Sequence, residues 1–558
     1  MSAIRIARGA LRSRVKPWSS VTLTRLVSPR SYHESDFETY KDSRQEMEYF
    51  YEVASIISSR KHIPQMRFST TGELGTLRSE LAQIAPSFKI AADNVSIFKT
   101  PSCFYETLLA RIRNANRRIF LSTLYIGKDQ HELVATLQNT LRQKPGVRLV
   151  ILTDALRGTR EAPEPCCASL LAPLVAEFGL GRVQIRMYHS PNLTGLKKMI
   201  IPKRINEGWG LQHMKFYGMD SEVFLTGANL STDYFTNRQD RYHLYRSAEM
   251  ANYFWDFIHT VSSLSFWVLP SDDASGFRLE WPSDNAVPNP LEQPEEFVEK
   301  ATPIMHAAVK PHAGQRDYRY PRDDCDFETP VRDTTVHITG QFSQLMKPDT
   351  STELPAITYL LKMLTAPRYA RSSWTFTAGY FNPAPWLTDL LLATTSQKSV
   401  VIAASPYANG FYKSSGVSGL LPDAYTFLAG KFLRAVKDQN KGSAVTLQEW
   451  QDGTVGEPGG WSYHAKGLWV TLPDERWPAI THIGSSNYTE RSYSHDLEVG
   501  ALIVTDSTDL RRRYGAEEDH LKAKATPVTL EDLEKPERRV GLQVRTAMWI
   551  VNLVGGAL

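Results

Sequence analysis

The sequence contains one small set of polar residues twice, and this repetition constrains the fold more than any other feature. The two sets are His213, Lys215, Asn229 and Asp240, then His464, Lys466, Asn487 and Glu498. The carboxylate follows the Asn by 11 residues in both sets, whereas the His and the Asn are 16 residues apart in the first and 23 in the second. Such a repeat predicts two similar units, each of which contributes half of a common site.

The hydrophobic pattern around the two sets is also repeated. Short apolar runs rich in β-branched residues alternate with helical patterns over 118–229, and the same succession recurs over 374–505. Buried strands that alternate with helices are typical of α/β proteins. We therefore predict an α/β fold in which two similar units are each built around a buried sheet.

Composition divides the chain further. A Pro-rich acidic stretch near 269–296 separates the two units. We expect six segments: a basic arm (1–38), an N-terminal helical segment (39–75), a first half (76–268), a connector with the Pro-rich stretch (269–345), a second half (346–530) and an amphipathic C-terminal tail (531–558).

The N-terminal arm has the composition of a targeting segment. Its first 33 residues contain seven Arg and Lys residues, several Ser and no Asp or Glu, which is typical of a mitochondrial transit peptide. The sequence has no run of 18 apolar residues, so we expect any membrane contact to be peripheral. Three segments combine apolar and basic residues in the manner of an anionic membrane interface: 196–204, 420–437 and 546–558.

Composition also argues against some classes of function. The formal net charge is only +4 and includes the basic arm, so a nucleic-acid partner is not expected. The four cysteines have no metal-ligand spacing, and the residues expected in the site include no metal set. We therefore expect no metal site and no cofactor required for the chemistry, whereas stimulation by a divalent cation and the oligomeric state stay open.

The paired residues suit a two-step phosphoryl exchange. A neutral imidazole attacks phosphorus best when a carboxylate holds its other nitrogen, and Asp240 and Glu498 are the candidates for this role. The lysines and the amides of Asn229 and Asn487 are expected to stabilise charge on the phosphoryl oxygens. The second His would protonate the leaving oxygen and then deprotonate the acceptor. A third His-x-Lys sequence, His520-Leu-Lys522, lacks the Asn and the carboxylate and is interpreted as surface.

The motifs resemble those of the phospholipase D superfamily, and within it the phosphatidylglycerophosphate synthases of eukaryotes. The likeness extends from about residue 95 to 506 and is carried by Leu211-Gln-His-Met-Lys215, Tyr463-His-Ala-Lys-Gly-Leu-Trp469 and Ile483-Gly-Ser-Ser-Asn487. It implies two α/β/α halves with mixed sheets that face each other across one active site.

The resemblance also implies an activity and a location. The activity would be transfer of the phosphatidyl group from CDP-diacylglycerol to sn-glycerol 3-phosphate through a phosphatidyl-histidine, in cardiolipin biosynthesis. The location would be the mitochondrial inner membrane, peripherally on the matrix side, at an anionic membrane surface. A phospholipase-D-like hydrolase and an inactive lipid-binding scaffold are the alternatives.

The two halves differ from each other in detail. Asp220 follows the first His by seven residues and would complete a His-Lys-Asp pattern, but the second half has Thr471 there. The second Asn turn contains Ser485, a candidate for phosphate binding, where the first has Gly227. We predict that His213 is the nucleophile and His464 the acid and base, with the reverse assignment left open.

Glycerol 3-phosphate is a dianion and requires cationic partners. Three arginines follow the Asn turns and are candidates to bind it: Arg238, Arg241 and Arg491. The alternative for each of them is an ion pair that serves the structure only.

Overall fold

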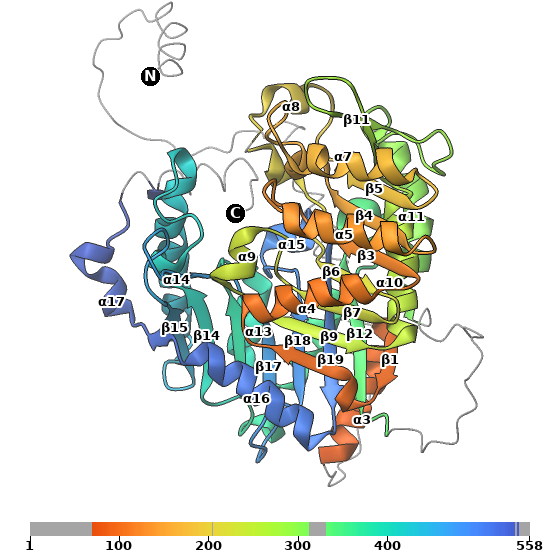
Figure 1. Cartoon of the computed structure of the whole chain (residues 1–558). Helices are drawn as coiled ribbons and strands as arrows, with labels where there is room; N and C mark the ends of the chain where they lie inside the picture. Colours follow the sequence, from red (N-terminus) through yellow and green to blue (C-terminus); the bar gives the residue numbers. More distant parts are fainter. Residues whose placement is uncertain (1–69, 204, 312–330, 542–543, 546–558) are drawn as a thin grey trace, which may run out of the picture. The chain divides into compact units, whose positions relative to one another are not determined.

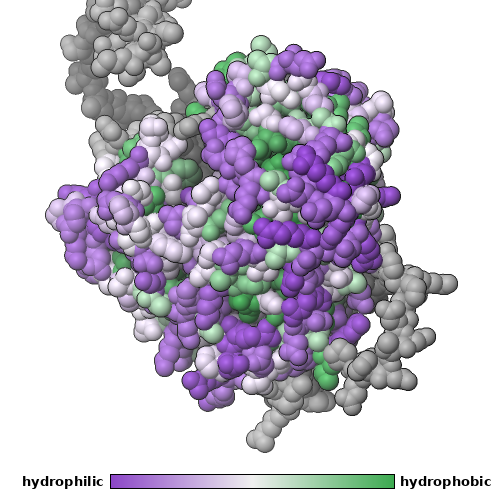
Figure 2. Space-filling view, viewed as in Figure 1, coloured by the Kyte–Doolittle hydropathy of each residue, from purple (hydrophilic) through white to green (hydrophobic). Residues whose placement is uncertain are grey.

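The computed structural model describes residues 70–203, 205–311, 331–541 and 544–545 (Figure 1). The predicted basic arm, most of the predicted segment 39–75 and the apolar end of the predicted tail therefore lie outside the described residues. Within the described part, no helix is both long and apolar enough to cross a membrane. Hydrophilic side chains cover most of the face seen in Figure 2, and the hydrophobic patches between them are small.

Nine strands form the first sheet: β2 (Val95–Phe98), β3 (Arg118–Ser122), β4 (Arg148–Asp154), β5 (Val183–Tyr188), β6 (Phe216–Met219), β7 (Glu222–Thr226), β9 (Tyr242–Arg246), β10 (Phe266–Pro270) and β11 (Phe277–Glu280). Their order is β11-β10-β5-β4-β3-β6-β7-β9-β2. Strands β3, β4 and β5 are parallel, whereas β6, β7 and β9 pair in antiparallel fashion, so the sheet is mixed.

Nine strands also form the second sheet: β1 (Ser87–Ile90), β12 (Thr334–Gln341), β13 (Ser373–Ala378), β14 (Ser399–Ala404), β15 (Val445–Trp450), β17 (Lys466–Thr471), β18 (Ile480–Gly484), β19 (Glu498–Thr505) and β20 (Ala525–Pro527). Their order is β1-β12-β19-β18-β17-β13-β14-β15-β20. The run β2-β9-β7-β6-β3-β4-β5 of the first sheet therefore corresponds to β12-β19-β18-β17-β13-β14-β15 of the second. The predicted α/β fold with two similar mixed-sheet halves is confirmed.

Helices cover the outer face of each sheet, and the inner faces share a core. Helices α4 (Pro101–Asn114), α5 (His131–Gln143) and α7 (Cys167–Phe178) pack on the first sheet (Figure 1). Helices α12 (Glu353–Met363), α13 (Pro385–Ala393) and α14 (Leu421–Asp438) pack on the second. Strands of both sheets meet α10 (Ala248–Ser262) and α11 (Pro294–Val309) in one central hydrophobic core. Both sheets are thus buried on both faces, which explains their nearly continuous apolar strands.

The borders of the halves differ from the predicted ones. Helix α3 (Thr70–Ile84) crosses the expected border at 75, and its Leu74, Leu77 and Leu81 pack in the core of the second half. Strand β1 follows α3 and extends the second sheet beside β12, which itself lies in the predicted connector. In contrast, β10 and β11 extend the first sheet. The connector therefore contributes strands to both sheets, because an unpaired sheet edge gains hydrogen bonds from any nearby segment.

Candidate active site

The two halves enclose one cavity of about 1550 Å³. Six of the predicted site residues line its wall: His213, Asn229, Arg238, His464, Asn487 and Arg491. Three come from each half: the histidines and asparagines lie beside the ends of β6, β7, β17 and β18, whereas Arg238 lies on the short strand β8 (Arg238–Gln239) and Arg491 on helix α15 (Glu490–Ser494). The repeated residues therefore converge on a common cavity, although the two histidines are 251 positions apart in the sequence.

Each histidine is held by the carboxylate of the opposite half. Nδ1 of His213 lies 2.9 Å from Oε1 of Glu498, and Nδ1 of His464 lies 2.6 Å from Oδ2 of Asp240. Because a carboxylate only accepts hydrogen bonds, Nδ1 carries the proton in both rings and Nε2 presents its lone pair. Both candidate carboxylates therefore orient a histidine, and each orients the histidine of the other half.

Backbone pairing across the halves explains this exchange. The amide of His213 donates to the carbonyl of Leu497, directly before Glu498, at 2.9 Å. In the other direction, the amide of His464 donates to the carbonyl of Gln239, directly before Asp240, at 2.8 Å. Two short strands, β8 (Arg238–Gln239) and β16 (Ser462–Tyr463), pair in parallel at this point. The position of each carboxylate is thus set by a main-chain hydrogen bond from its histidine to the residue directly before the carboxylate.

The two Asn turns hold their carboxylates differently. The hydroxyl of Ser485 donates to Oε2 of Glu498, and its own amide is bonded to Val499. In the first half, a Cβ added to Gly227 would lie 2.7 Å from Oδ1 of Asp240, so no side chain fits there. The amide of Arg241 donates to Oδ1 of Asp240 instead, at 2.8 Å. Ser485 therefore orients Glu498 and lies behind the cavity wall.

Burial sets the protonation of the site. It lowers the pKa of both His213 and His464 well below the ordinary imidazole value, and the nearby lysine charges lower each further. Burial also raises the pKa of Asp240 to about 6 and that of Glu498 to about 7. Both imidazoles are therefore neutral near pH 7, which is the form that a nucleophile or a base requires.

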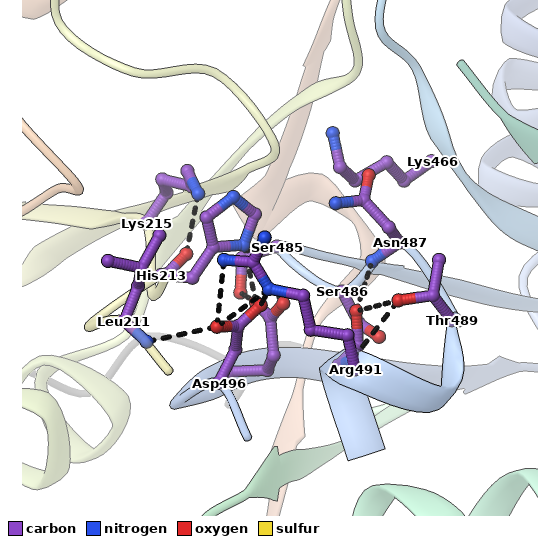
Figure 3. Close-up of polar contacts among 12 residues, drawn as sticks. Leu211, His213, Lys215, Lys466, Ser485, Ser486, Asn487, Thr489, Arg491 and Asp496 are labelled. Atoms are coloured by element: carbon purple, nitrogen blue, oxygen red, sulfur yellow. Dashed lines mark hydrogen bonds and ion pairs between the residues drawn. The ribbon is translucent and has the colours of Figure 1, made fainter. Parts of the chain in front are cut away.

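The lysines lie behind the histidines and not on the cavity wall. Lys215 is fully buried and Nζ donates to the carbonyl of His213 at 2.6 Å. Nζ of Lys466 lies 3.0 Å from Nε2 of His464, and burial lowers the pKa of Lys466 to about 8. Figure 3 shows both lysines on either side of the imidazole of His213. Their charge acts on the site across short distances in a medium that screens poorly.

The two Nε2 atoms have different surroundings. Nε2 of His464 lies 3.2 Å from the hydroxyl of Tyr234, and the side chain of His464 is 4% exposed. Nε2 of His213 has no hydrogen-bond partner in the described part of the chain, and its side chain is 11% exposed. His213 therefore presents the freer lone pair to the cavity.

The two asparagine amides are directed at the same cavity. The side-chain oxygens of Asn229 and Asn487 are buried and have no hydrogen-bond partner among the described residues. Nδ2 of Asn229 donates to the hydroxyl of Tyr234 at 3.1 Å. Buried polar atoms without partners are rare in folded proteins and suit contact with a bound molecule.

The structure separates the three predicted arginines. Arg238 and Arg491 line the cavity, where Arg238 pairs with Asp233 at 2.8 Å and Arg491 pairs with Asp496 at 3.1 Å (Figure 3). The side chain of Arg241 is fully buried and does not reach the cavity. The prediction that Arg241 binds substrate is wrong, because the side chain extends into the second half and forms its hydrogen bonds there.

Arg241 instead connects the two halves. Its Nε and Nη2 donate to the carboxylate of Glu517 on α16 (Thr508–Lys522), at 3.0 and 2.9 Å. Its Nη1 and Nη2 also donate to the carbonyl of His482 and the hydroxyl of Thr481, both on β18. The guanidinium further stacks 3.8 Å from the centre of the Trp469 ring. Arg241 therefore forms an ion pair that serves the structure, which is the alternative that the sequence analysis left open for it.

Asp220 is structural as well, contrary to its prediction as a catalytic residue. It occupies the turn between β6 and β7 with φ of 52°, and its carboxylate accepts the amides of Asn116, Arg117 and Arg118. Strand β6 separates it from Lys215, and five residues of extended chain span roughly 16 Å. The carboxylate therefore stabilises a turn at the far end of the strand, and Asp220 does not line the cavity.

Three further residues belong to the site. Tyr234 and Tyr380 contact the ring of His464 edge-on, with ring centres 5.1 and 5.4 Å away. Asp496 accepts the amide of Leu211 at 3.0 Å and the guanidinium of Arg491 (Figure 3). Tyr380 lies just past the end of β13, where the sequence does indicate a ligand-facing edge. Tyr234 and Asp496 have no distinctive spacing and emerge only in three dimensions.

Within the described ranges, no cluster of three or more His, Cys, Asp or Glu side chains is placed to hold a metal ion. Asp240 and Glu498 are engaged by the histidines, Asp233 by Arg238 and Asp496 by Arg491.

Comparison with known proteins places this arrangement among related folds. A crystal structure of phosphatidylserine synthase from Haemophilus influenzae superimposes with a TM-score of 0.61 over 87% of this chain and 98% of that chain, at 18% identity. That protein has a phospholipase-D-like fold, and the likeness supports the same fold here. No family model matches the sequence.

Curated relatives are much closer in sequence. The CDP-diacylglycerol–glycerol-3-phosphate 3-phosphatidyltransferase of Saccharomyces cerevisiae is 42% identical over 498 residues, which cover 86% of this chain and 92% of the relative. The chicken protein of the same name, specified as mitochondrial, is 32% identical over 487 residues, covering 83% and 84%. The chain therefore belongs to the family of CDP-diacylglycerol–glycerol-3-phosphate 3-phosphatidyltransferases and has a phospholipase-D-like fold.

Proposed function

We propose that the protein transfers the phosphatidyl group of CDP-diacylglycerol to sn-glycerol 3-phosphate, with phosphatidylglycerophosphate and CMP as products. The names of its relatives supply both substrates. The observation that carries the two-step chemistry is the pair of neutral histidines on one cavity, each with Nδ1 held by the carboxylate of the other half. The product would serve phosphatidylglycerol and cardiolipin synthesis.

His213 is the nucleophile of the first step. Its Nε2 attacks the phosphorus of the phosphatidyl group, a P–N bond forms, and the P–O bond to CMP breaks with its electron pair passing to CMP. The free lone pair of Nε2 and the greater exposure of His213 support this role over the reverse one. Glu498 stabilises the positive charge that the imidazole acquires.

His464 acts as acid and base. CMP leaves as a phosphate, whose oxygen is only weakly basic, so the leaving group needs little help from a proton. In the second step Nε2 of His464 takes the proton of the acceptor hydroxyl, whose oxygen attacks the phosphorus while the P–N bond breaks. Burial lowers the pKa of His464, which keeps it neutral and ready for this step.

The phosphates are held by the cations and amides of the cavity wall. Arg238 and Arg491 enter from opposite halves, and each pairs with one carboxylate, Asp233 or Asp496. Asn229 and Asn487 line the same wall, and a side-chain amide can donate through Nδ2 to a phosphoryl oxygen. The chemistry as written requires no metal ion; whether a divalent cation stimulates it is a separate measurement.

The proposed location is the matrix side of the mitochondrial inner membrane, where the protein binds peripherally to an anionic surface. The acid-free basic composition of the first 33 residues and the mitochondrial designation of vertebrate relatives support this location.

The test is CMP release from CDP-diacylglycerol in detergent by the full chain, with and without glycerol 3-phosphate, and with the lipid product identified by mass. Acceptor-dependent release with phosphatidylglycerophosphate is expected. Acceptor-independent release with phosphatidic acid as the lipid product would show that the protein is a hydrolase and not a transferase. If the folded protein releases no CMP under either condition, the remaining interpretation is an inactive lipid-binding scaffold.

A matched pair of variants ties the activity to the site. His213→Ala is expected to lower CMP release by roughly 10³-fold or more, as loss of a nucleophile does. His520→Ala is the control, because His520 has the same spacing to Lys522 but lies on α16 outside the cavity. Full activity in the His213 variant would exclude the proposed intermediate.

A further inference from the structure

Helix α8 (Gly195–Ile200) places large apolar side chains in water. Leu196 is 72% exposed, Met199 82% and Ile200 75%, and no residue of the helix is buried. Ile205, shortly after the helix, is 57% exposed. Large apolar side chains grouped in this way on a folded surface generally mark a binding face.

The other described segment that the sequence proposed for membrane contact has its apolar face covered. Helix α14 buries Phe432 and Val436 against the second sheet. Its Ala424 and Leu428 contact Val540 and Val544 near the end of the described chain. The third segment, 546–558, lies outside the described residues. Both α14 and α8 combine apolar and basic residues in sequence. They differ in packing, because the apolar side chains of α14 are covered by the protein whereas those of α8 are exposed.

Helix α8 is also part of the rim of the active-site cavity. Leu196 and Lys197 line the cavity, as do Ile205, Trp209 and Leu211 further along the same segment. Leu211 is followed within two residues by His213. A mainly apolar part of the cavity lining therefore runs along the chain from the exposed helix to the proposed nucleophile.

The charges beside these side chains have one predominant sign. Lys197, Lys198 and Lys203 are exposed on the same segment. The one acidic residue between 195 and 211 is Glu207, which pairs with Arg160. In Figure 1 α8 lies at the upper edge of the body, and hydrophobic and hydrophilic atoms alternate there in Figure 2. Apolar side chains between lysines suit the headgroup region of an anionic bilayer.

We infer that α8 inserts into an anionic membrane surface and positions the cavity rim so that a lipid enters along the apolar part of the cavity lining. Met199 and Ile200 enter the acyl boundary, Lys197 and Lys198 contact anionic headgroups, and Leu196 begins the path of the lipid toward His213. This inference rests on the proposed function for the identity of the lipid substrate, but the membrane contact itself is measurable without any reaction.

The first experiment locates the contact. A single cysteine at position 199 (Met199→Cys) is labelled with an environment-sensitive fluorophore in the full chain carrying Cys103→Ser and Cys325→Ser. Cys166 and Cys167 are buried and remain. Vesicles of phosphatidylcholine with phosphatidylglycerol, and doxyl lipid as quencher, should shift the emission to the blue and quench it. The same label at Leu180→Cys, an exposed position before β5, should stay in water.

The second experiment tests whether the contact serves the reaction. Met199→Ser with Ile200→Ser should weaken vesicle binding by about 10-fold or more, given the apolar surface removed. Transfer from CDP-diacylglycerol in vesicles should fall in parallel, while transfer from a short-chain substrate in detergent should not change. Neither residue lines the cavity, and Leu180→Ser is the matched control.

A label at position 199 that stays in water while the protein sediments with vesicles would overturn the inference. Equal loss of activity in detergent and in vesicles would do so too, because it would indicate a defect in the site. If α8 enters vesicles but neither substrate form yields phosphatidylglycerophosphate, the membrane contact stands and the proposed function fails.

Discussion

Asp240 holds His464 across the boundary between the two halves, with 2.6 Å between Oδ2 and Nδ1. Glu498 holds His213 in the opposite direction. Neither half therefore has a complete site, and the duplicated motif works only when the halves are docked. The same docking is reinforced by the paired strands β8 and β16 and by Arg241.

We expect Glu498→Gln and Asp240→Asn each to lower kcat by about 10²- to 10⁴-fold with a smaller change in KM. A neutral amide neither fixes the Nδ1–H tautomer nor stabilises the imidazolium. Steady-state CMP release in detergent measures both constants.

Asp220→Asn is the matched control for these carboxylates. Asp220 accepts three main-chain amides at a turn, so its amide variant should lose stability but keep a kcat close to that of the unmodified protein. A loss of kcat equal to that of Glu498→Gln would contradict the placement of Asp220 outside the site.

A covalent intermediate should accumulate when its breakdown is blocked. His464→Ala removes the proposed base of the second step and leaves Nε2 of His213 able to attack, so CDP-diacylglycerol should convert the protein to a phosphatidyl adduct. Intact-protein and peptide mass spectrometry at neutral pH would place the adduct on His213. Formation of an adduct on His464 in the His213→Ala variant, and none here, would reverse the two roles.

The pH dependence of kcat/KM should have two limbs inside the neutral range. The orienting carboxylates must be ionised, and burial raises the pKa of Asp240 to about 6 and of Glu498 to about 7, so activity falls as the pH drops through these values. Lys466 must be charged, and burial lowers its pKa to about 8, so activity falls as the pH rises beyond it. Each limb belongs to a coupled group of residues. An acid limb near pH 4 would contradict this account.

Arg241→Ala should destabilise the fold by about 3–5 kcal/mol, because it removes the guanidinium that pairs with the buried carboxylate of Glu517 and leaves that carboxylate with hydrogen bonds to His243 and Trp469. Urea unfolding followed by tryptophan fluorescence measures the change. Arg142→Ala, which breaks an exposed pair with Glu177, should leave the free energy of unfolding almost unchanged, because solvent screens exposed pairs. Similar changes in the free energy of unfolding of both variants would mean that Arg241 does not stabilise the contact between the halves.

Gly227 should not tolerate a side chain. Gly227→Ala brings a Cβ within 2.7 Å of Oδ1 of Asp240, so the carboxylate must move and the hydrogen bond to His464 is lost or lengthened. We expect lower kcat with little change in substrate binding. Gly146→Ala is the control, since no atom lies within 4 Å of the added Cβ. Unchanged kcat in the Gly227 variant would show that the turn adapts.

Much of the architecture follows from local patterns. The apolar runs expected over 374–505 include β14 and β15, and the helical patterns expected over 118–229 include α5. Strand and helix periodicities arise from residues that are neighbours in sequence, so short apolar runs and their spacing suffice to predict them. The repeated His, Lys and Asn likewise predicted a single shared cavity, because equivalent positions of two similar sheets lie at equivalent ends.

The sequence by itself therefore determined the α/β class, the duplication and the histidines of the site. The tertiary structure alone decided which carboxylate orients which histidine, that Arg241 and Asp220 serve the scaffold, and that Tyr234 and Tyr380 border His464. These contacts join residues more than 80 positions apart, as between Tyr380 and His464, or 285 apart, as between His213 and Glu498. No spacing along the chain encodes them, because they depend on how two separately folded sheets pack against each other.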